Sequence, residues 1–322
     1  KAALFSKLDL LTHMVGEFPS LQGIVGRVYA LKGGEKKEVA DAIGEHYLPQ
    51  GAEDDLPKTQ AGAILAICDK IDNIVGFSGN SRDIDKIRAD IKKIKISGSL
   101  DPYGVRRNAF GIVRIIKDRL LRLKLDELIE KAIELYGAKI KDEPVRFKEQ
   151  LIYYLEDRID FLMGDIKPPE LKKAVLESGA FDIADIFKRQ EALVEIKNET
   201  YFLQAAKVVE RTGNILKGAR GEKIGDVDDK LFKEDLEKKV WKVYLNSKDK
   251  IEAFINKERY KDATKEYAQA FFKVLHDFFD KVLVNAGDRA LRLNRLAMMK
   301  AINELYTERV ADLAKLPQIV VK

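Results

Sequence analysis

Apolar residues recur every three or four positions along most of this 322-residue chain, and that spacing limits it to folds built from amphipathic helices. The alternation of apolar and polar residues that is typical of half-buried strands is nearly absent. The sequence therefore predicts an all-α protein. The clearest apolar faces are expected to comprise Val105, Ala109, Ile112, Val113, Ile116 and Leu120 in one helix, and Phe147, Leu151, Tyr154, Leu155 and Ile159 in another.

Glycine and proline end the predicted helices at "LKGGEKK", "YGAKIKDEP" and "MGDIKPPE", because glycine adopts the left-handed cap conformation and proline cannot continue a helix. At about 150 residues per domain, a chain of this length is expected to form two domains. We predict a first helical domain at 1–145, a connecting helical segment at 146–197 and a second helical domain at 198–322. The glycine-bearing stretch 211–226 is predicted to be a loop within the second domain.

Composition excludes several classes of protein. No apolar run approaches the roughly 18 residues that cross a bilayer, and the first residues do not resemble a signal peptide. The single cysteine, Cys68, cannot form an internal disulfide, which fits a cytoplasmic protein. Because Cys68 lies in the apolar run "AILAICDKI", we expect a core thiol and not a nucleophile. The chain starts at Lys1 without a methionine, so we expect a fragment or a processed piece.

The net charge of +5 conceals an asymmetry along the chain. The window 82–124 holds thirteen basic and five acidic residues, a net charge of +8, so the rest of the chain carries −3. A local excess of this kind attracts a polyanion such as nucleic acid. The alternative is a solvated lysine-rich face, which is the usual fate of charge runs.

Within that window, the stretch "GSLDPYGVRR" at 98–107 has the form of a helix start. Asp101 can act as the N-cap and Pro102 fits the first turn. Arg106 and Arg107 follow at a position where the helix dipole favours anions. An external phosphate would explain this pair, because the helix start and both guanidinium groups would attract the same anion. The alternative is an internal ion pair between an arginine and an acid such as Asp101 or Asp72.

Most catalytic motifs are missing. No glycine-rich loop ends in Gly-Lys-Ser/Thr, and "QGIVGRVYALKGG" lacks the strand that a dinucleotide fingerprint requires. The three histidines lie far apart in sequence, which argues against a zinc site. The dipeptide His276-Asp277 is the signature of helical metal-dependent phosphohydrolases, but no other histidine lies in this half of the chain. Asp69 and Asp72 can share a helix face, but no His-Asp pair occurs in their part of the chain. We therefore expect neither catalytic residues nor a metal site.

Several strings resemble one family, the beta subunits of bacterial heterotetrameric glycyl-tRNA synthetase. "KAALFSKLDLLTHMVGEFPSLQGIVGRVYALKGGE", "AIGEHYLPQGAEDDLP", "AICDKIDNIVGFS" and "DPYGVRRNAFGIVRII" are similar to the central region of that subunit, and "FFDKVLVNAGDRALRLNRLAMMKAINELY" is similar to its end. Their order and approximate spacing match across nearly the whole chain. The resemblance covers only the C-terminal half of the subunit.

The resemblance implies a fold and a role. Residues 1–145 would be a catalytically degenerate domain similar to the His-Asp (HD) phosphohydrolase fold, and 198–322 a helical anticodon-binding domain known by the residues Asp-Ala-Leu-Arg (DALR). This sequence has "DRALRLNRL" at the comparable place, a related but not identical string. Attachment of glycine to its tRNA, with ATP and magnesium, would belong to the alpha subunit of an alpha2-beta2 enzyme. This chain would bind glycine-accepting tRNA in the cytoplasm, with no cofactor of its own and no membrane contact.

On this basis we expect two groups of tRNA contacts. One would meet the tRNA backbone on the acceptor side, since Arg107 and Arg114 lie seven residues apart on one helix face. The other would meet the anticodon side, where unpaired bases need hydrogen-bond donors and aromatic stacking. The acceptor-side group is Lys92, Lys93, Lys95, Arg106, Arg107 and Arg114; the anticodon-side group is Tyr201, Arg211, Asn214, Lys217, Arg220, Arg289, Arg292, Asn294 and Arg295.

Three further expectations concern these regions. Arg289, Arg292 and Arg295 are predicted to form one basic stripe. Tyr267 and Phe202 are further stacking candidates, with core packing the stronger alternative for Phe202, and Leu291, Leu296, Met298 and Met299 should be core. The basic segment at 80–100 is longer than the family pattern, and Ile84, Ile87, Ile91 and Ile94 favour a short helix there.

Two other functions stay open. One is an active metal-dependent HD-type nucleotide phosphohydrolase. The other is an assembly scaffold that binds protein partners without touching RNA, against which the basic window is the main argument.

Overall fold

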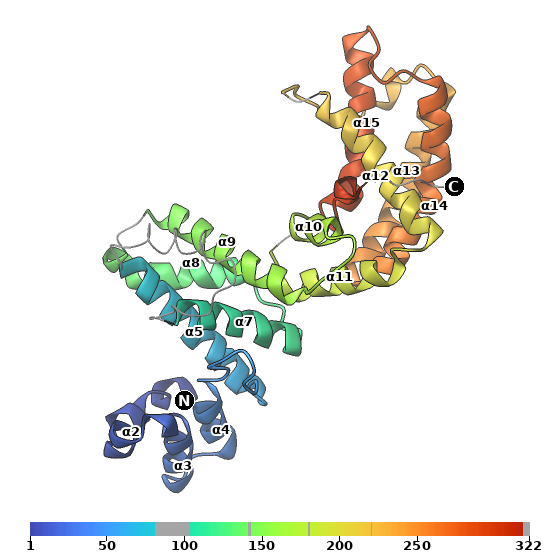
Figure 1. The fold of residues 1–322 in the computed structure, drawn as a ribbon. Helices are drawn as coiled ribbons and strands as arrows, with labels where there is room; N and C mark the ends of the chain where they lie inside the picture. The colour runs from blue at the N-terminus through green and yellow to red at the C-terminus, as the bar shows by residue number, and fades with distance from the viewer. Residues whose placement is uncertain (81–103, 141–142, 180, 220, 318–322) are drawn as a thin grey trace. The chain divides into compact units, whose positions relative to one another are not determined.

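The computed structural model describes residues 1–80, 104–140, 143–179, 181–219 and 221–317 (Figure 1). Every regular element in these ranges is a helix, which confirms the predicted all-α class. The short helix expected from Ile84 to Ile94 lies outside the described residues.

The chain forms two compact units. Unit 1 comprises the described residues up to 162 together with 182–184, and unit 2 comprises 163–181 with the described residues from 185 onward. The segment 146–197, predicted as a connection, is divided between them. Its first helix belongs to unit 1, and most of the remainder belongs to unit 2.

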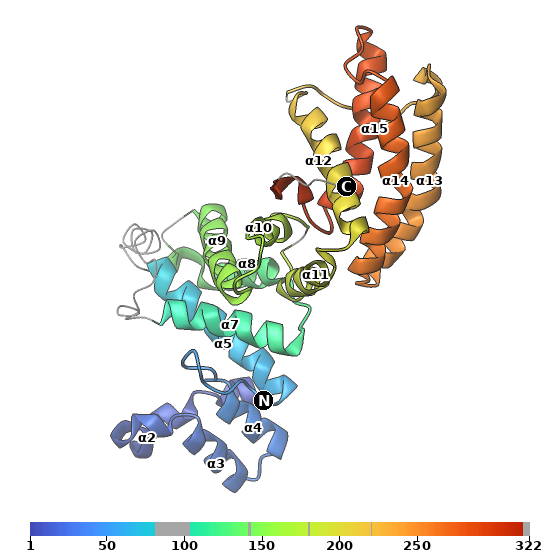
Figure 2. The same ribbon diagram turned by 45° about the vertical axis from the view of Figure 1, so that its right-hand side comes forward.

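Unit 1 begins with short helices and continues into longer ones that pack on one another (Figures 1 and 2). Helices α7 (Val105–Arg119) and α8 (Leu125–Tyr136) both pack against α5 (Gln60–Asn80), and α9 (Pro144–Leu162) packs against α7 and α8. The helices are α1 (Ala2–Phe5), α2 (His13–Glu17), α3 (Ile24–Lys32), α4 (Lys37–Glu45), α5 (Gln60–Asn80), α7 (Val105–Arg119), α8 (Leu125–Tyr136) and α9 (Pro144–Leu162).

The predicted apolar faces form the core of unit 1. The face of α7 is buried from Val105 to Ile116, and all five predicted positions of α9 are buried. Leu120 is the exception, because α7 ends at Arg119 and Leu120 takes the left-handed conformation beyond it (φ 49°), which leaves its side chain 49% exposed. The period of the pattern was therefore right, and only its last position was wrong.

Cys68 is exposed and not a core residue. Its neighbours Ala66, Ile67 and Ile71 take the buried positions of α5, which turns Cys68 outward. Partial burial and the carboxylate of Asp69 raise the pKa of the Cys68 thiol. A raised pKa lowers the thiolate fraction at neutral pH.

Unit 2 is a bundle in which α12 (Thr200–Lys217), α13 (Asp235–Asn256), α14 (Tyr260–Lys281) and α15 (Arg289–Thr307) lie side by side (Figures 1 and 2). Two further helices, α10 (Glu170–Leu176) and α11 (Ile183–Ile196), adjoin the bundle. Buried Arg189 joins these parts, because its guanidinium donates to the carbonyls of Val175 and Val310 at 2.8 Å and to Asp185 at 2.7 Å. These bonds fix α11 to the end of α10 and to the segment that follows α15.

The loop predicted at 211–226 begins later than expected, because α12 continues to Lys217. Gly213 lies inside this helix. A Cβ placed there would lie 3.6 Å from the Asn303 amide nitrogen. The same amide donates to Thr212 Oγ1 at 2.8 Å. That distance is ordinary van der Waals contact, and glycine at this position does not mark a turn.

A buried ion pair joins α13 to α15. Arg295 Nε donates to Glu237 Oε1 at 2.7 Å, and the two side chains are 6% and 0% exposed. Glu237 Oε2 also accepts from the backbone N–H groups of Lys233 and Glu234, at 2.8 and 2.6 Å. Burial by itself raises the pKa of Glu237, but these hydrogen bonds outweigh it and lower the pKa. The carboxylate therefore stays charged and completes the capping box of α13.

Replacing Glu237 with glutamine should destabilise unit 2 by about 3 kcal/mol, because Arg295 would be buried without a counter-charge. The wild-type contribution should fade as pH falls, since the pKa of Glu237 is lowered in the folded state. Calorimetric unfolding at pH 7 measures the loss. Asp235→Asn, on the exposed first turn of the same helix, is the control and should change stability by under about 0.5 kcal/mol. Equal stability of Glu237→Gln and wild type would contradict this account.

Unit 1 contains a buried lysine. Lys70 is 2% exposed and donates to the Tyr47 carbonyl at 3.2 Å. Burial lowers the pKa of Lys70 to about 8. The folded protein therefore releases this proton at a lower pH than the unfolded chain does.

The free energy of unfolding should consequently rise as pH increases from about 8 to 10, and stay level with respect to this group below pH 8. Lys70→Met should remove that rise, which amounts to roughly 3 kcal/mol for a shift of this size. Urea unfolding of both proteins at pH 7 and pH 9.5 measures the difference. Parallel pH dependence in the two proteins would show that the ammonium is not buried as described.

Candidate nucleic-acid interface

The arginine pair lies at the start of α7. The N-cap of this helix is Gly104, in the left-handed region at φ 66°, and Val105 is the first helical residue. Asp101 and Pro102 lie outside the described residues, so the cap predicted at Asp101 is replaced by Gly104 in the described helix. Arg107 is exposed and Arg106 half-buried. Both arginines stand in the first turn, as predicted, where free N–H groups favour an anion.

Arg114, two turns further along α7, has internal partners. Its guanidinium donates to the carbonyls of Gly51 and Asp54 at 3.1 and 3.0 Å. Arg119 donates to the Pro57 carbonyl in the same loop. These arginines hold the loop between α4 and α5 against α7. The partners of Arg114 among the described residues are thus backbone carbonyls; Asp101, one of the acids considered from the sequence, lies outside the described residues.

The remaining acceptor-side candidates cannot be placed. Lys92, Lys93 and Lys95 lie outside the described residues, as does the basic segment 81–100 as a whole. The described remainder of the basic window is carried by α7 and the residues that follow it. The exposed basic residues in this described part of the window include Arg107, Lys117, Arg122 and Lys124.

In unit 2, the three arginines at the start of α15 do not form one exposed stripe. Arg289 is exposed in the first turn. Arg292 forms a two-pronged ion pair with Glu222, one bond of which measures 2.7 Å. Arg295 is buried in its pair with Glu237. The spacing of three residues rotates the side chains progressively inward, so only Arg289 stays on the surface without such a partner among the described residues.

Asn294 and Arg211 also have internal roles. Asn294 is 4% exposed and bonds both backbone groups of Asp228, at 2.8 and 2.9 Å, which secures the segment before α13. Arg211 lies over the Phe279 ring, 4.6 Å from its centroid, which is the geometry of a cation–π contact. Asn214 is exposed, and Arg220 lies outside the described residues.

Lys217 is exposed beside acidic groups. It borders an open cavity of about 730 Å³ that is also lined by Glu177, Glu308 and Asp312. Carboxylates at the same opening repel phosphate, so the surroundings of Lys217 favour an RNA backbone less than those of Arg107 or Arg289.

The aromatic candidates divide by burial. Tyr201 is half-buried. Tyr267 is fully buried and donates to the Ile302 carbonyl at 3.0 Å, so its stacking role is corrected to a core role. Phe202 is buried, as its spacing favoured, and so are Leu291, Leu296, Met298 and Met299. One half-exposed aromatic was missed: Trp241, the only tryptophan of the chain, whose signal was its position among lysines in "KKVWK".

His276 is exposed, and its Nδ1 lies 2.9 Å from Asp280 Oδ2. Asp280 is on the same helix as His276, so this contact does not bring together residues of separate helices as a metal site of this kind would require. Among the described residues, no group of three or more His, Cys, Asp and Glu side chains is placed to hold a metal ion. Nor is any helix in the described ranges long and apolar enough to cross a membrane.

Comparison with known proteins gives the family. The model of the "Glycyl-tRNA synthetase beta subunit" family matches residues 1–177, and the "DALR anticodon binding domain" model matches 206–308. A "Glycine--tRNA ligase beta subunit" of Syntrophus aciditrophicus (strain SB) is 35% identical over 317 residues, which are 98% of this chain and 44% of that protein. The protein of the same name from Streptococcus pneumoniae (strain P1031) is 36% identical over an alignment of 324 positions that covers 100% of this chain and 43% of that protein.

The chain thus spans somewhat less than half the length of these relatives. The DALR match falls on α12 to α15, the bundle that carries Arg289. The match to the beta-subunit model covers unit 1 and continues into α10. With more than half of its residues matched by one model, this chain belongs to the glycyl-tRNA synthetase beta subunit family.

Proposed function

We propose that this chain is the tRNA-binding part of a cytoplasmic glycine–tRNA ligase. The observation that supports this most directly is the match of an anticodon-binding model to residues 206–308, which form the α12–α15 bundle of unit 2. Activation of glycine with ATP and magnesium would belong to an alpha subunit, and this chain would contribute recognition of the tRNA. The likeness of residues 1–145 to a degenerate HD domain is part of the same proposal.

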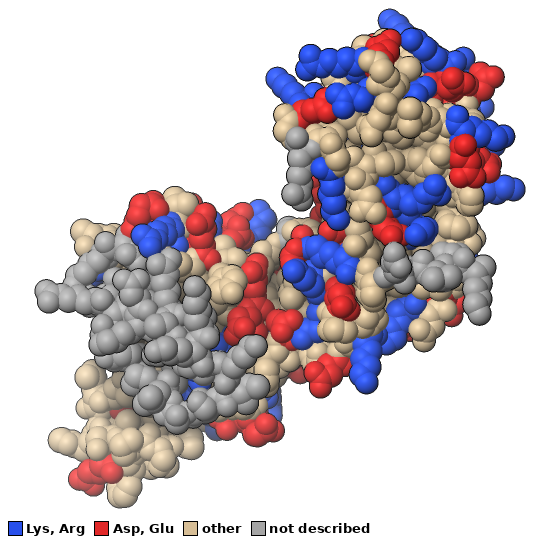
Figure 3. Space-filling view, turned by 45° about the horizontal axis from the view of Figure 1, so that its top comes forward, with Lys and Arg blue, Asp and Glu red and all other residues tan. Residues whose placement is uncertain are grey.

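Two exposed arginines, one in each unit, fit a phosphate ligand best. Arg107 and Arg289 each occupy the first turn of a helix. No side chain caps α7, so its backbone N–H groups and the guanidinium of Arg107 can act on the same anion. At α15 the Asp288 carboxylate accepts from the N–H groups of Ala290 and Leu291, so a phosphate there would depend on the guanidinium of Arg289 itself. In Figure 3, Lys and Arg side chains crowd the end of unit 2 where the turn before α15 lies, mixed with Asp and Glu. We infer that backbone contacts come from these two positions, with Arg106 beside Arg107. Arg114, Arg292, Asn294 and Arg295 would support the surface from within.

The proposal is tested by titrating the chain with glycine-accepting tRNA, with the same tRNA carrying an altered anticodon, and with a non-cognate tRNA, at two salt concentrations. Cognate tRNA should bind most tightly, and the affinity should fall with added salt because phosphate contacts release counterions. Equal affinity for all three, or no binding, would contradict a role in reading tRNA.

The same titration should show which arginines contact tRNA phosphates. Arg107→Ala and Arg289→Ala should each weaken binding several-fold and reduce the salt slope by about one unit, as expected for a lost phosphate contact. Arg146→Ala, an exposed arginine of α9 outside the proposed interface, is the matched control and should leave affinity and slope unchanged. If Arg107→Ala or Arg289→Ala changed the affinity no more than Arg146→Ala does, that arginine would not belong to the interface.

A second function, assembly with another protein subunit, is favoured by the start of unit 1. Large apolar side chains gather on the surface there, including Leu4 at 76%, Leu11 at 82% and Ile24 at 58% exposure. Figure 3 shows this part of the molecule as largely uncharged. An exposed apolar patch of this density marks a protein contact. Because the relatives are named as beta subunits, we infer that an alpha subunit covers this face.

Leu11→Asp should abolish co-elution of the chain with a purified alpha subunit in size-exclusion chromatography, because a carboxylate would have to be desolvated in the contact. Its exposed side chain leaves the fold intact. Leu135→Asp, at a leucine that is 79% exposed on α8 and lies outside the patch, provides the control. Co-elution that survives Leu11→Asp would place the subunit contact elsewhere.

A further inference from the structure

Trp241 lies at the edge of the exposed side of α13. Its ring stacks on that of Tyr244 with centroids 4.6 Å apart and planes inclined by only 9°. Tyr244 is buried and Trp241 is half-buried. Since Tyr244 covers one face of the indole, the exposure of Trp241 belongs to its other face and its edge. The stack also fixes the plane of the ring against the bundle.

Three lysines of α13 lie on the same side of the helix as Trp241, and Asp249 and Glu252 lie further along that side. At about 100° of rotation per residue, Lys238, Lys242 and Lys248 all project within roughly 100° of Trp241 around the axis of α13. No residue in the described part of the chain forms an ion pair with Lys242 or Lys248, and Lys238 lies 3.5 Å from exposed Asp235. Leu245, 57% exposed and four residues after Trp241, extends the flat apolar part of this surface.

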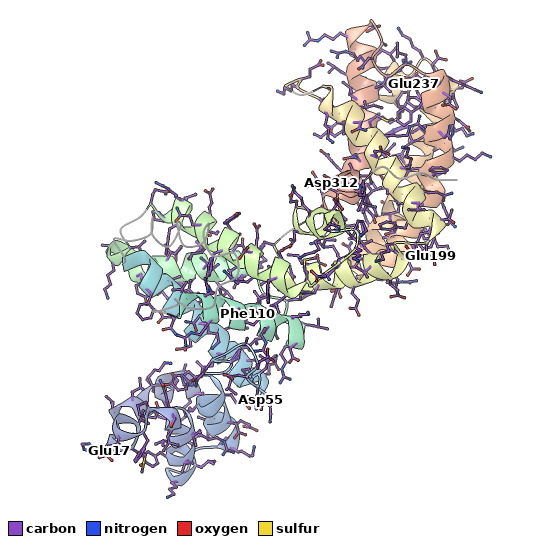
Figure 4. All side chains as sticks on the ribbon, in the orientation of Figure 1. Glu17, Asp55, Phe110, Glu199, Glu237 and Asp312 are labelled. Atoms are coloured by element: carbon purple, nitrogen blue, oxygen red, sulfur yellow. The ribbon has the colours of Figure 1, made fainter. Side chains whose placement is uncertain are left out.

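The position of Trp241 in the bundle is also fixed. It follows Glu237 by one helical turn, and Figure 4 shows Glu237 near one end of unit 2. The buried pair of Glu237 with Arg295 holds this end of α13 against the start of α15. The indole therefore stands on a rigid support, which limits the entropy lost when a ligand stacks on it.

A flat, half-exposed aromatic ring beside lysines suits one class of ligand, an unpaired nucleobase with its phosphates. Stacking on an aromatic side chain contributes about 1–3 kcal/mol per base, and neighbouring lysines hold the backbone. We propose that Trp241 is a stacking platform for an unpaired base of the bound RNA, with Lys238 and Lys242 as its phosphate contacts. This rests on the proposed function, because it names the part of the DALR-matched bundle that holds single-stranded RNA.

The chain contains one tryptophan, so tryptophan emission, excited at a wavelength that tyrosine does not absorb, reports on this position alone. Glycine-accepting tRNA and a short single-stranded RNA with its anticodon-loop sequence are titrated into the full chain, while the anisotropy of an end-labelled copy of each RNA reports binding independently. We expect tryptophan emission to be quenched, with the same midpoint as the anisotropy change. A fully paired RNA duplex should quench much less, since it offers no unpaired base.

Variants sharpen the test. Lys238→Ala combined with Lys242→Ala leaves the indole in place and should weaken RNA binding about tenfold or more, with quenching shifted to the same higher concentration. Lys257→Ala, an exposed lysine beyond the end of α13, is the control and should change neither readout. Trp241→Phe should retain more affinity than Trp241→Leu, because only the first keeps an aromatic ring on Tyr244.

The outcomes separate the two proposals. RNA binding by anisotropy with unchanged tryptophan emission would overturn the stacking role and leave the tRNA-binding function standing. Absence of binding in both readouts would overturn both. Emission that changes only when an alpha subunit is added would identify this surface as a protein contact and overturn its assignment to RNA.

Discussion

Unit 2 depends on the buried ion pair between Glu237 and Arg295. It links the beginning of α13 to α15, and the same carboxylate caps α13 through two backbone N–H groups. A buried charge is tolerated only when its partner and hydrogen bonds offset the lost hydration, and here both are present. Exposed Arg289 on α15 and half-buried Trp241 on α13 lie on the two helices that this pair joins.

Unit 1 uses arginines in a comparable way. Arg114 and Arg119 donate to backbone carbonyls of the loop between α4 and α5, so a charged side chain replaces the regular hydrogen bonds that the loop lacks. In both units some basic residues have internal structural roles while others face solvent. The net charge of a segment is therefore a poor guide to which basic side chain can bind a ligand. The side of the helix on which a residue lies decides whether a ligand in solution can reach it.

The apolar surface at the start of unit 1 and the charged surface of unit 2 point to different partners. Leu4, Leu11 and Ile24 expose area that a folded protein normally buries, whereas Arg289 and the lysines around Trp241 offer positive charge and one open aromatic face. A protein subunit suits the first surface and single-stranded RNA suits the second. The two proposed roles, assembly and tRNA binding, thus use separate residues and can be tested separately.

The sequence by itself determined the helical class and the core of α7 and α9, because a 3.6-residue period places the apolar positions on one side wherever the helix packs. Its resemblance to the beta-subunit family agrees with the matched family models. Only the tertiary structure decided that Arg295 and Asn294 face inward, that Cys68 faces outward and that Trp241 is half-exposed. Burial of a polar side chain depends on a partner such as Glu237, 58 residues away along the chain, and local spacing carries no information about such a partner.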